Sequence, residues 1–308
     1  MKDFKSGFVT ILGRTNVGKS TLLNSLIGEK IAIMANKPQT TRTQIKGILN
    51  RENSQIIFLD TPGIHKPKSK LSNIMVQTAF ESAKDVDLVL FIIEATSKDI
   101  GRGDTLILEK IKESKKKAIL VINKIDLVKK EDLLKLIELY SKEYNFEAVV
   151  PMSAVQGNKN EELLEEIEKA LDYGPKYYDD ETYTDQTIRM IVEETIREKA
   201  LKLLDDEVPH GIFVEVQKLK KGKTMKNEPV FNIEATIYCQ RESHKGIIIG
   251  KKGSMLKQIG TYAREDLEKT LGEKVNLQTW VKVRKDWQDE DSIVKKFKID
   301  NWIKVYFK

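Results

Sequence analysis

The hydrophobic positions of this 308-residue chain follow different patterns in its two halves. In the first half, short and nearly continuous apolar runs recur with room for a helix between them. Such runs are typical of strands buried on both faces of a sheet. The clearest span residues 8–12, 56–59, 88–93, 118–122 and 148–150. Because helical patterns lie between the runs, the sequence predicts a doubly wound α/β domain with a mostly parallel sheet, over residues 1–172.

The second half has a different order. A helical pattern at 187–206 is followed by two alternating strand patterns at 212–219 and 230–238, then by a helix-turn-helix and a third strand. This order predicts a small α+β domain over residues 187–308. The helical pattern predicts an apolar face of Ile188, Val192, Ile196, Ala200 and Leu203. The stretch 173–186, with its Gly-Pro pair and its run of acids and tyrosines, breaks both periods and is interpreted as a linker.

The net charge and its distribution indicate which partners the chain can bind. The formal net charge of +6 permits contact with nucleic acid or an anionic membrane but does not require it. In the second half the basic residues cluster, at 218–226 and 241–257. The single cysteine, Cys239, cannot form an intrachain disulfide, and no apolar run approaches the ~20 residues of a membrane span. We therefore expect a cytoplasmic protein.

Residues 13–20 read GRTNVGKS and fit the phosphate-binding pattern GxxxxGK[ST], between a predicted strand and a predicted helix. The glycines allow main-chain N–H groups to turn inward onto phosphate, while Lys19 can reach the β and γ phosphates and Ser20 can bind Mg²⁺. The residues predicted to contact nucleotide here are Gly13, Arg14, Thr15, Asn16, Val17, Gly18, Lys19, Ser20 and Thr21.

A second motif ends the predicted strand at 56–59. Its aspartate can hold Mg²⁺ through water, and its glycine N–H can meet the γ phosphate. Its members are Asp60, Thr61, Pro62 and Gly63. In the polar segment 38–43, we expect Thr41 to bind the metal and sense the γ phosphate, with Thr40 as the alternative. The predicted metal ligands are thus Ser20, Thr41 and Asp60.

Base recognition is predicted at two further strand ends. Asp126 can accept hydrogen bonds from two guanine groups that adenine lacks, so a buried carboxylate there would be left unpaired against ATP. We expect Asn123 to tie the loops together and Lys124 to lie along the base, with Ser153 and Ala154 beside the guanine oxygen. The predicted cofactors are GTP or GDP with Mg²⁺.

The catalytic set lacks one familiar member. Ras-like hydrolysis orients its water with a glutamine at the position that Ile64 occupies here, so we expect slow intrinsic hydrolysis. Two interpretations of Asn16 stay open. Its side chain can help bind K⁺ where an arginine finger would place charge, or it can hydrogen-bond its own loop. The candidate catalytic residues are Lys19, Thr41, Gly63 and Asn16.

In the second half, residues 247–254 read IIIGKKGS and join an apolar run to a helix through a GxxG turn with two lysines. A loop of this kind approaches the nucleic-acid backbone in KH modules, beside an apolar groove that holds about four unpaired bases. The residues predicted to bind RNA are Gly250, Lys251, Lys252, Gly253, Lys245 and Ile249.

Across nearly its whole length the chain resembles the Era family of bacterial GTPases. The resemblance is carried by GRTNVGKST, PQTTR, DTPGIH, NKID, IREKALKLLDDEVPHGIFVEV and IIIGKKGSMLKQIG. It implies a P-loop GTPase joined to a type II KH domain, binding to the 3′ end of small-subunit (16S) ribosomal RNA, a role in 30S assembly and peripheral contact with the inner membrane. We expect a monomer. The chain departs from the family at 286–308, which is longer and more aromatic.

The leading hypothesis is a switch in which Thr41 and the segment 63–72 report the nucleotide state to the RNA domain. Two alternatives stay open, a GTPase coupled to RNA modification and a scaffold whose second domain binds protein. The aromatic tail at 294–308 is expected to pack on the domain edge, with membrane or RNA contact as its alternative.

Overall fold

The computed structural model describes residues 4–35, 37, 40–205 and 208–297. By its contacts the chain forms two compact units. The first contains Met1–Ala32, Thr41–Asp185 and Asp291–Lys308, and the second contains Ile33–Thr40 and Gln186–Glu290. Two segments therefore fall outside the predicted domain limits: the short stretch 33–40 groups with the second half, and the described residues from 291 onwards group with the first.

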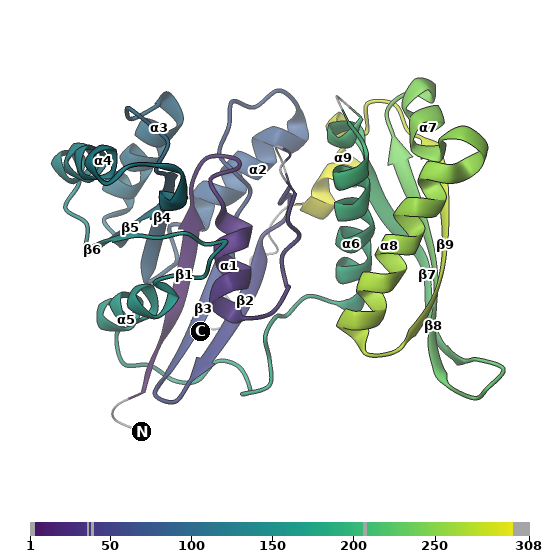
Figure 1. Cartoon of the computed structure of the whole chain (residues 1–308), viewed down its shortest axis with the longest axis horizontal. Helices are drawn as coiled ribbons and strands as arrows, with labels where there is room; N and C mark the ends of the chain where they lie inside the picture. Colours follow the sequence, from purple (N-terminus) through teal and green to yellow (C-terminus); the bar gives the residue numbers. More distant parts are fainter. Residues whose placement is uncertain (1–3, 36, 38–39, 206–207, 298–308) are drawn as a thin grey trace. The chain divides into compact units, whose positions relative to one another are not determined.

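The first unit is built on a six-stranded sheet (Figure 1). The strand order is β2-β3-β1-β4-β5-β6, with β2 antiparallel to β3 and all other neighbours parallel. This is the mostly parallel sheet that the apolar runs predict. The strands are β1 (Lys5–Leu12), β2 (Ile45–Arg51), β3 (Ser54–Asp60), β4 (Leu88–Glu94), β5 (Lys117–Asn123) and β6 (Ala148–Pro151).

Helices cover both faces of this sheet. Those of one face supply one buried apolar cluster, and those of the other face supply a second. One face carries α1 (Lys19–Ile27) and α5 (Asn160–Ala170). The other face carries α2 (Lys70–Glu81), α3 (Arg102–Ser114) and α4 (Lys130–Glu143). Because the parallel strands β1, β3, β5 and β6 end at the same edge, the four predicted nucleotide loops lie together there.

The stretch predicted as a linker is held on the first unit up to residue 185. The side-chain oxygen of Gln55, on β3, accepts hydrogen bonds from the main-chain N–H groups of Tyr177 (2.7 Å) and Tyr178 (3.0 Å). Farther along, the N–H of Ile48 donates to the carbonyl of Tyr183 at 2.8 Å. A broken hydrophobic period correctly indicates the lack of helix or strand, but it does not indicate that the backbone is free.

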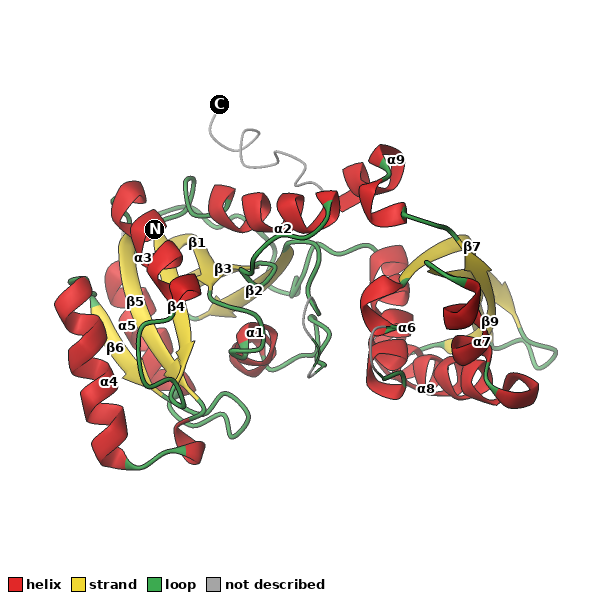
Figure 2. Ribbon diagram, turned by 90° about the horizontal axis from the view of Figure 1, so that it is seen from above, coloured by secondary structure: helices red, strands yellow, loops and turns green. Residues whose placement is uncertain are grey.

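The second unit is a three-stranded sheet with helices on one face (Figure 2). Its strand order is β7-β8-β9, with β7 antiparallel and β9 parallel to β8. Its elements are α6 (Ile188–Leu203), β7 (Phe213–Lys223), β8 (Pro229–Cys239), α7 (Glu242–Ile249), α8 (Ser254–Leu271) and β9 (Lys274–Val283). The resulting order, αββααβ, is the type II KH arrangement expected from the resemblance.

The helices of this unit share one apolar core with the inner face of the sheet. On α6 the predicted apolar face is present, with Val192, Ile196 and Ala200 fully buried, although Ile188 at its start is exposed. Trp287, in the short turn Trp287–Asp289, is also fully buried, and its indole N–H donates to the carbonyl of Gly211 at 3.0 Å.

Beyond this turn, α9 (Asp291–Val294) and the turn Lys295–Phe297 complete the described chain. Val294, where the predicted tail begins, is buried, and so is Ile293 just before it. The tail's other aromatic residues, Trp302, Tyr306 and Phe307, lie outside the described residues. In the described part of the chain, no helix has the length and hydrophobicity needed to cross a membrane.

Candidate nucleotide site and nucleic-acid groove

The phosphate loop runs from the end of β1 to the start of α1, and its geometry excludes side chains at both motif glycines. A Cβ atom on Gly13 would come within 2.5 Å of the carbonyl oxygen of Ile92. Gly18 has φ of 103°, and a Cβ there would lie 2.2 Å from Nδ2 of Asn123. No side chain caps α1, so its first N–H groups stay available to an anion.

Lys19 lies inside this loop. Its ammonium group donates to the carbonyls of Gly13 (3.2 Å) and Arg14 (2.8 Å), and its side chain is almost fully buried. Burial lowers the pKa of Lys19 to about 8, an effect that the negative charge of Asp60 partly opposes. Negative phosphate in the loop would offset the cost of burying this cation.

Three oxygen-bearing side chains meet beside the loop. The Ser20 hydroxyl donates to Oδ2 of Asp60 at 2.7 Å, and the Thr41 hydroxyl lies 2.8 Å from that of Ser20 and 3.3 Å from the same carboxylate oxygen. Asp60 is fully buried, which raises the pKa of its carboxyl group. Its other oxygen, Oδ1, has no hydrogen-bond partner among the described residues. A buried carboxylate with a spare oxygen and two hydroxyls suits Mg²⁺, which prefers oxygen ligands.

The two threonines considered for the metal have different surroundings. Thr41 belongs to the cluster just described. The hydroxyl of Thr40 instead donates to the carbonyls of Ala35 (3.0 Å) and Lys37 (2.6 Å), within its own segment. The geometry therefore favours Thr41 over Thr40.

Asn123 connects three loops of the site. Its amide nitrogen donates to the carbonyl of Val17 at 2.8 Å, and its amide oxygen accepts from the N–H of Ala154 at 2.9 Å. The phosphate loop and the last loop are thereby fixed to the end of β5. This is the connection that the sequence predicts for Asn123.

Two further residues lie in the loops after β5 and β6, which are expected to hold the base. Lys124 donates to the carbonyl of Asn16 and to the carboxylate of Glu94, both at 2.8 Å. Ser153 is buried, and its hydroxyl has no hydrogen-bond partner among the described residues. A free polar atom in this buried loop is suited to a ligand.

Asp126 differs from its expected environment. The sequence argument assumes a buried carboxylate, but Asp126 is exposed in the short turn Ile125–Leu127. Water can hydrate this carboxylate until a base covers it. The discrimination between guanine and adenine therefore depends on how fully the bound base excludes water from Asp126.

Ile64 is more remote from catalysis than its position in the motif indicates. Its side chain is 3% exposed and belongs to the apolar cluster on one face of the sheet. Its N–H donates to the carbonyl of Gly13 at 3.1 Å. Gly63 has no room for a side chain, because a Cβ there would come within 2.7 Å of the Cα of Thr15. Ile64 thus fixes the two phosphate-facing loops together.

The sequence does not indicate one support of the phosphate loop. The guanidinium of Arg14 lies 3.1 Å and 3.0 Å from the two carboxylate oxygens of Asp104, and it also donates to the hydroxyl of Ser97 at 2.9 Å. Burial raises the pKa of Asp104, an effect that the charge of Arg14 opposes. An acid in the first turn of α3 is ordinary in a sequence, so nothing distinguishes Asp104 before the fold is known.

In the second unit, the GxxG turn joins α7 to α8. Gly250, Lys252 and Gly253 have positive φ values of 71°, 51° and 79°. A Cβ on Gly250 would lie 2.9 Å from the main-chain nitrogen of Met255, whereas one on Gly253 would meet nothing within 4 Å. Lys251 and Lys252 are exposed. The turn therefore presents two cations and an open glycine surface.

A groove of about 360 Å³ adjoins this turn, between α8 and β9. Apolar, small and basic residues line it: Gly253, Leu256, Lys257, Gly260, Thr261, Arg264, Leu277 and Thr279. Of the residues predicted to bind RNA, only Gly253 is among them. Lys245 pairs with Glu242 at 3.7 Å, and Ile249 is partly buried on α7. Leu256, Lys257 and Gly260 lie in the segment IIIGKKGSMLKQIG, but no sequence pattern marks them or the β9 residues as groove residues, so only the fold reveals that role.

The two units define a P-loop GTPase domain followed by a KH domain. Residues 8–124 match the family model described as 50S ribosome-binding GTPase, and residues 207–288 match the model described as KH domain. The chain is 53% identical over 291 residues to GTPase Era of Clostridium kluyveri, an alignment that covers 94% of this chain and 98% of the relative. It is also 53% identical to GTPase Era of Caldanaerobacter subterraneus subsp. tengcongensis, over 95% and 97% of the two chains.

Solved structures of Era are also similar to this chain over nearly its whole length. The crystal structure of Era in complex with MgGDPNP and nucleotides 1506-1542 of 16S ribosomal RNA has a TM-score of 0.91 and 41% identity, and covers 96% of this chain and 98% of that one. A variant of Aquifex aeolicus Era bound to GDP·AlF4⁻ has the same TM-score and identity, over 96% and 99%. The chain belongs to the GTPase Era family. It is a GTPase, and its cofactors are GTP or GDP with Mg²⁺.

Proposed function

We propose that this chain is a GTP-driven switch that binds the 3′ end of small-subunit ribosomal RNA and assists assembly of the 30S subunit. The observation that carries the RNA half is the exposed Lys251–Lys252 turn beside a groove lined by Leu256 and Leu277. The lysines suit phosphates, and the groove suits unpaired bases. The related Era structure holds a fragment of 16S ribosomal RNA.

In the nucleotide half, the N–H groups of the phosphate loop and Lys19 bind the phosphates, and Ser20, Thr41 and Asp60 hold the metal. Mg²⁺ held by these three side chains would offset the negative charge of the phosphates during hydrolysis. We assign Gly63 the role of meeting the γ phosphate through its N–H group, and Asp126 that of selecting guanine.

Hydrolysis is slow in this proposal because Ile64 lies in the core and cannot orient water. Asn16 is exposed with φ of 64°, and its carbonyl accepts from Lys124, but its side chain has no hydrogen bond to a described residue. That leaves the side chain available to K⁺ and gives no support to the alternative of a bond within its own loop.

We infer a cytoplasmic location from the lone free Cys239 and from the proposed ribosomal partner. Peripheral contact with the inner membrane and a monomeric state remain part of the proposal. The membrane contact rests on the family resemblance.

The charge-reversed variant Lys251→Asp/Lys252→Asp tests the RNA half. We expect it to bind an RNA oligonucleotide of the 16S 3′ end at least tenfold more weakly, with a shallower salt dependence, since each lost phosphate contact removes about 0.7 from the logarithmic slope. Lys223→Asp/Lys226→Asp is the matched control, because it makes the same charge change at exposed positions of the β7–β8 hairpin. If both variants lose the same affinity for RNA, the loss comes from the change in net charge and not from the turn. If the first variant keeps its affinity, the Lys251–Lys252 turn does not bind RNA.

A further inference from the structure

Helix α6 has a charged face in addition to its apolar one, formed by Glu194, Arg197 and Glu198 at helical spacing. Arg197 and Glu198 are 2% and 0% exposed, although they follow directly on the core residue Ile196. Charged side chains are almost never fully buried unless they are paired. This face must therefore have polar partners.

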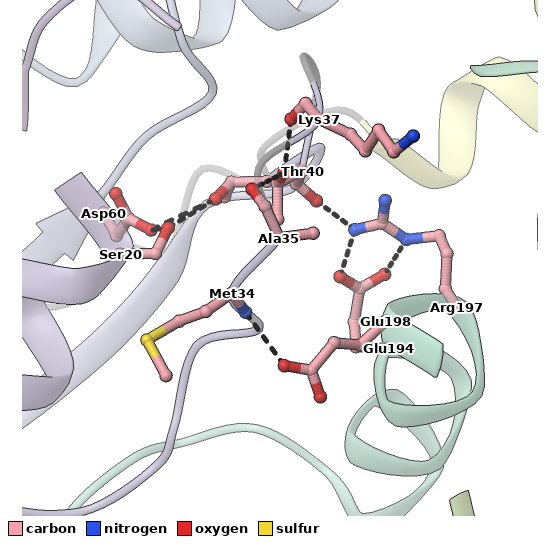
Figure 3. A network of polar contacts seen from close by, with 10 residues as sticks. Ser20, Met34, Ala35, Lys37, Thr40, Asp60, Glu194, Arg197 and Glu198 are labelled. Atoms are coloured by element: carbon pink, nitrogen blue, oxygen red, sulfur yellow. Dashed lines mark hydrogen bonds and ion pairs between the residues drawn. The ribbon is translucent and has the colours of Figure 1, made fainter. Parts of the chain in front are cut away.

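The partners include the main chain of the segment 33–40, which belongs to the same compact unit as α6. The N–H of Met34 donates to the Glu198 carboxylate at 3.2 Å, and the Arg197 guanidinium donates to the carbonyl of Thr40 (Figure 3). Both contacts are made to backbone groups. These two contacts therefore do not depend on the side chains of Met34 and Thr40.

Arg197 is itself held in one orientation. Its Nε donates to Oε1 of Glu194 at 2.9 Å, and its Nη2 donates to the other oxygen of that carboxylate. A two-pronged pair of this kind fixes the plane of the guanidinium. The Thr40 hydroxyl donates to the carbonyls of Ala35 and Lys37. Thr40 is thus held through both its carbonyl and its hydroxyl.

The carbonyl of Thr40 and the N–H of Thr41 belong to one planar peptide group. Thr40 is anchored on α6, while the hydroxyl of Thr41 lies with Ser20 and Asp60 in the metal cluster. We propose that Arg197, oriented by Glu194, is a positioning residue for GTP hydrolysis. It holds the peptide so that the Thr41 hydroxyl lies where Mg²⁺ binds. The inference rests on the proposed role of Thr41 as a metal ligand.

This coupling works in both directions. If the Arg197 contact favours the metal-binding position of Thr41, then a metal and a γ phosphate that hold Thr41 must equally favour the Arg197 contact. A threonine of this kind is needed only while the γ phosphate is present. Loss of Arg197 should therefore affect the triphosphate state and leave GDP binding intact.

The test uses the full-length protein without RNA. GTP hydrolysis is measured against Mg²⁺ concentration, and GDP affinity is measured by calorimetry. We expect Arg197→Gln to lower kcat about tenfold and to raise the Mg²⁺ concentration at half-maximal rate by a similar factor, with GDP affinity changed less than twofold. Glu194→Gln should give a smaller loss, and Arg197→Lys should recover part of the rate. Arg284→Gln is the control, because Arg284 makes a similar two-pronged pair with Glu290 in the same unit.

A folded Arg197→Gln protein with a normal rate and a normal Mg²⁺ requirement would overturn the proposal, and so would an equal loss of GDP and GTP binding. If Arg197→Gln does not fold, Arg197→Lys and Glu194→Gln carry the same test. The proposed RNA function is judged separately, by whether the unmodified chain binds the ribosomal RNA fragment. Either proposal can fail while the other stands.

Discussion

The exposed carboxylate of Asp126 allows a clean test of base selectivity. Guanine N1–H and its exocyclic amino group can both donate to this carboxylate. In Asp126→Asn one acceptor remains, and the other becomes an N–H group that faces the amino group of the base. Hydrogen bonds to charged groups contribute about 1.5–3 kcal/mol each. One bond to the charged group is lost, the other becomes a weaker bond to a neutral oxygen, and Asp126 is hydrated before binding, so we take the lower end of the range for two bonds. This is about 3 kcal/mol, or roughly a 150-fold loss of GDP affinity.

The fold should be unaffected, since the loop is held through Asn123 and Lys124 rather than through Asp126. Xanthine carries a carbonyl where guanine carries its amino group, so the new amide N–H of Asp126→Asn can donate to it. We therefore expect XDP to bind the variant more tightly than GDP does. Calorimetry with both nucleotides, with Asp132→Asn as a control at an exposed acid of α4, measures this. The reasoning is refuted if GDP affinity changes less than threefold or if XDP gains nothing.

Two further predictions concern catalysis and stability. Asn16→Ala should abolish any stimulation of hydrolysis by KCl over NaCl while GDP affinity stays within a few-fold, as its main-chain contact to Lys124 remains. Persistent stimulation by potassium would exclude a cation role for the side chain. Trp287→Ala should lower the free energy of unfolding of the second unit by about 3–5 kcal/mol, because it empties a fully buried site and leaves the carbonyl of Gly211 without its donor. Trp280→Ala, at a tryptophan that is 42% exposed, should cost much less in the same urea denaturation series, and equal losses would contradict the assignment of Trp287 to the core.

The parts of the fold that were predictable are those in which neighbouring residues carry the signal. Continuous apolar runs indicate the five parallel strands because both faces of the sheet are covered. The nucleotide loops were predictable because each motif follows such a run. Asn123 is an example, since its position at the end of β5 implies that it meets the phosphate loop, and its bonds to Val17 and Ala154 show that it does.

Features that depend on contacts distant in sequence were not predictable. Gln55 looks like a polar break in a strand, yet its amide holds the chain at Tyr177 and Tyr178. The exposure of Asp126 depends on how the loop after β5 is folded, and the motif spacing carries no information about that. The burial of Trp287 depends on residues more than 70 positions earlier, since its ring packs on Phe213 and its indole N–H donates to the carbonyl of Gly211.

The charged face of α6 is the clearest example of a feature that the sequence does not predict. It shows why residue composition can mislead about the contacts of a segment that responds to the nucleotide. In the sequence, Glu194, Arg197 and Glu198 lie off the predicted apolar face and would be interpreted as solvated charges. Besides their side-chain partners Glu194 and Lys202, Arg197 and Glu198 bind backbone groups of Thr40 and Met34, more than 150 residues earlier, and a backbone group leaves no trace in side-chain identity. A charged side chain that binds a backbone group recognises the position of that group, whichever side chain the residue carries. Such a contact is lost when the segment moves, and it is kept when residues of the segment are substituted.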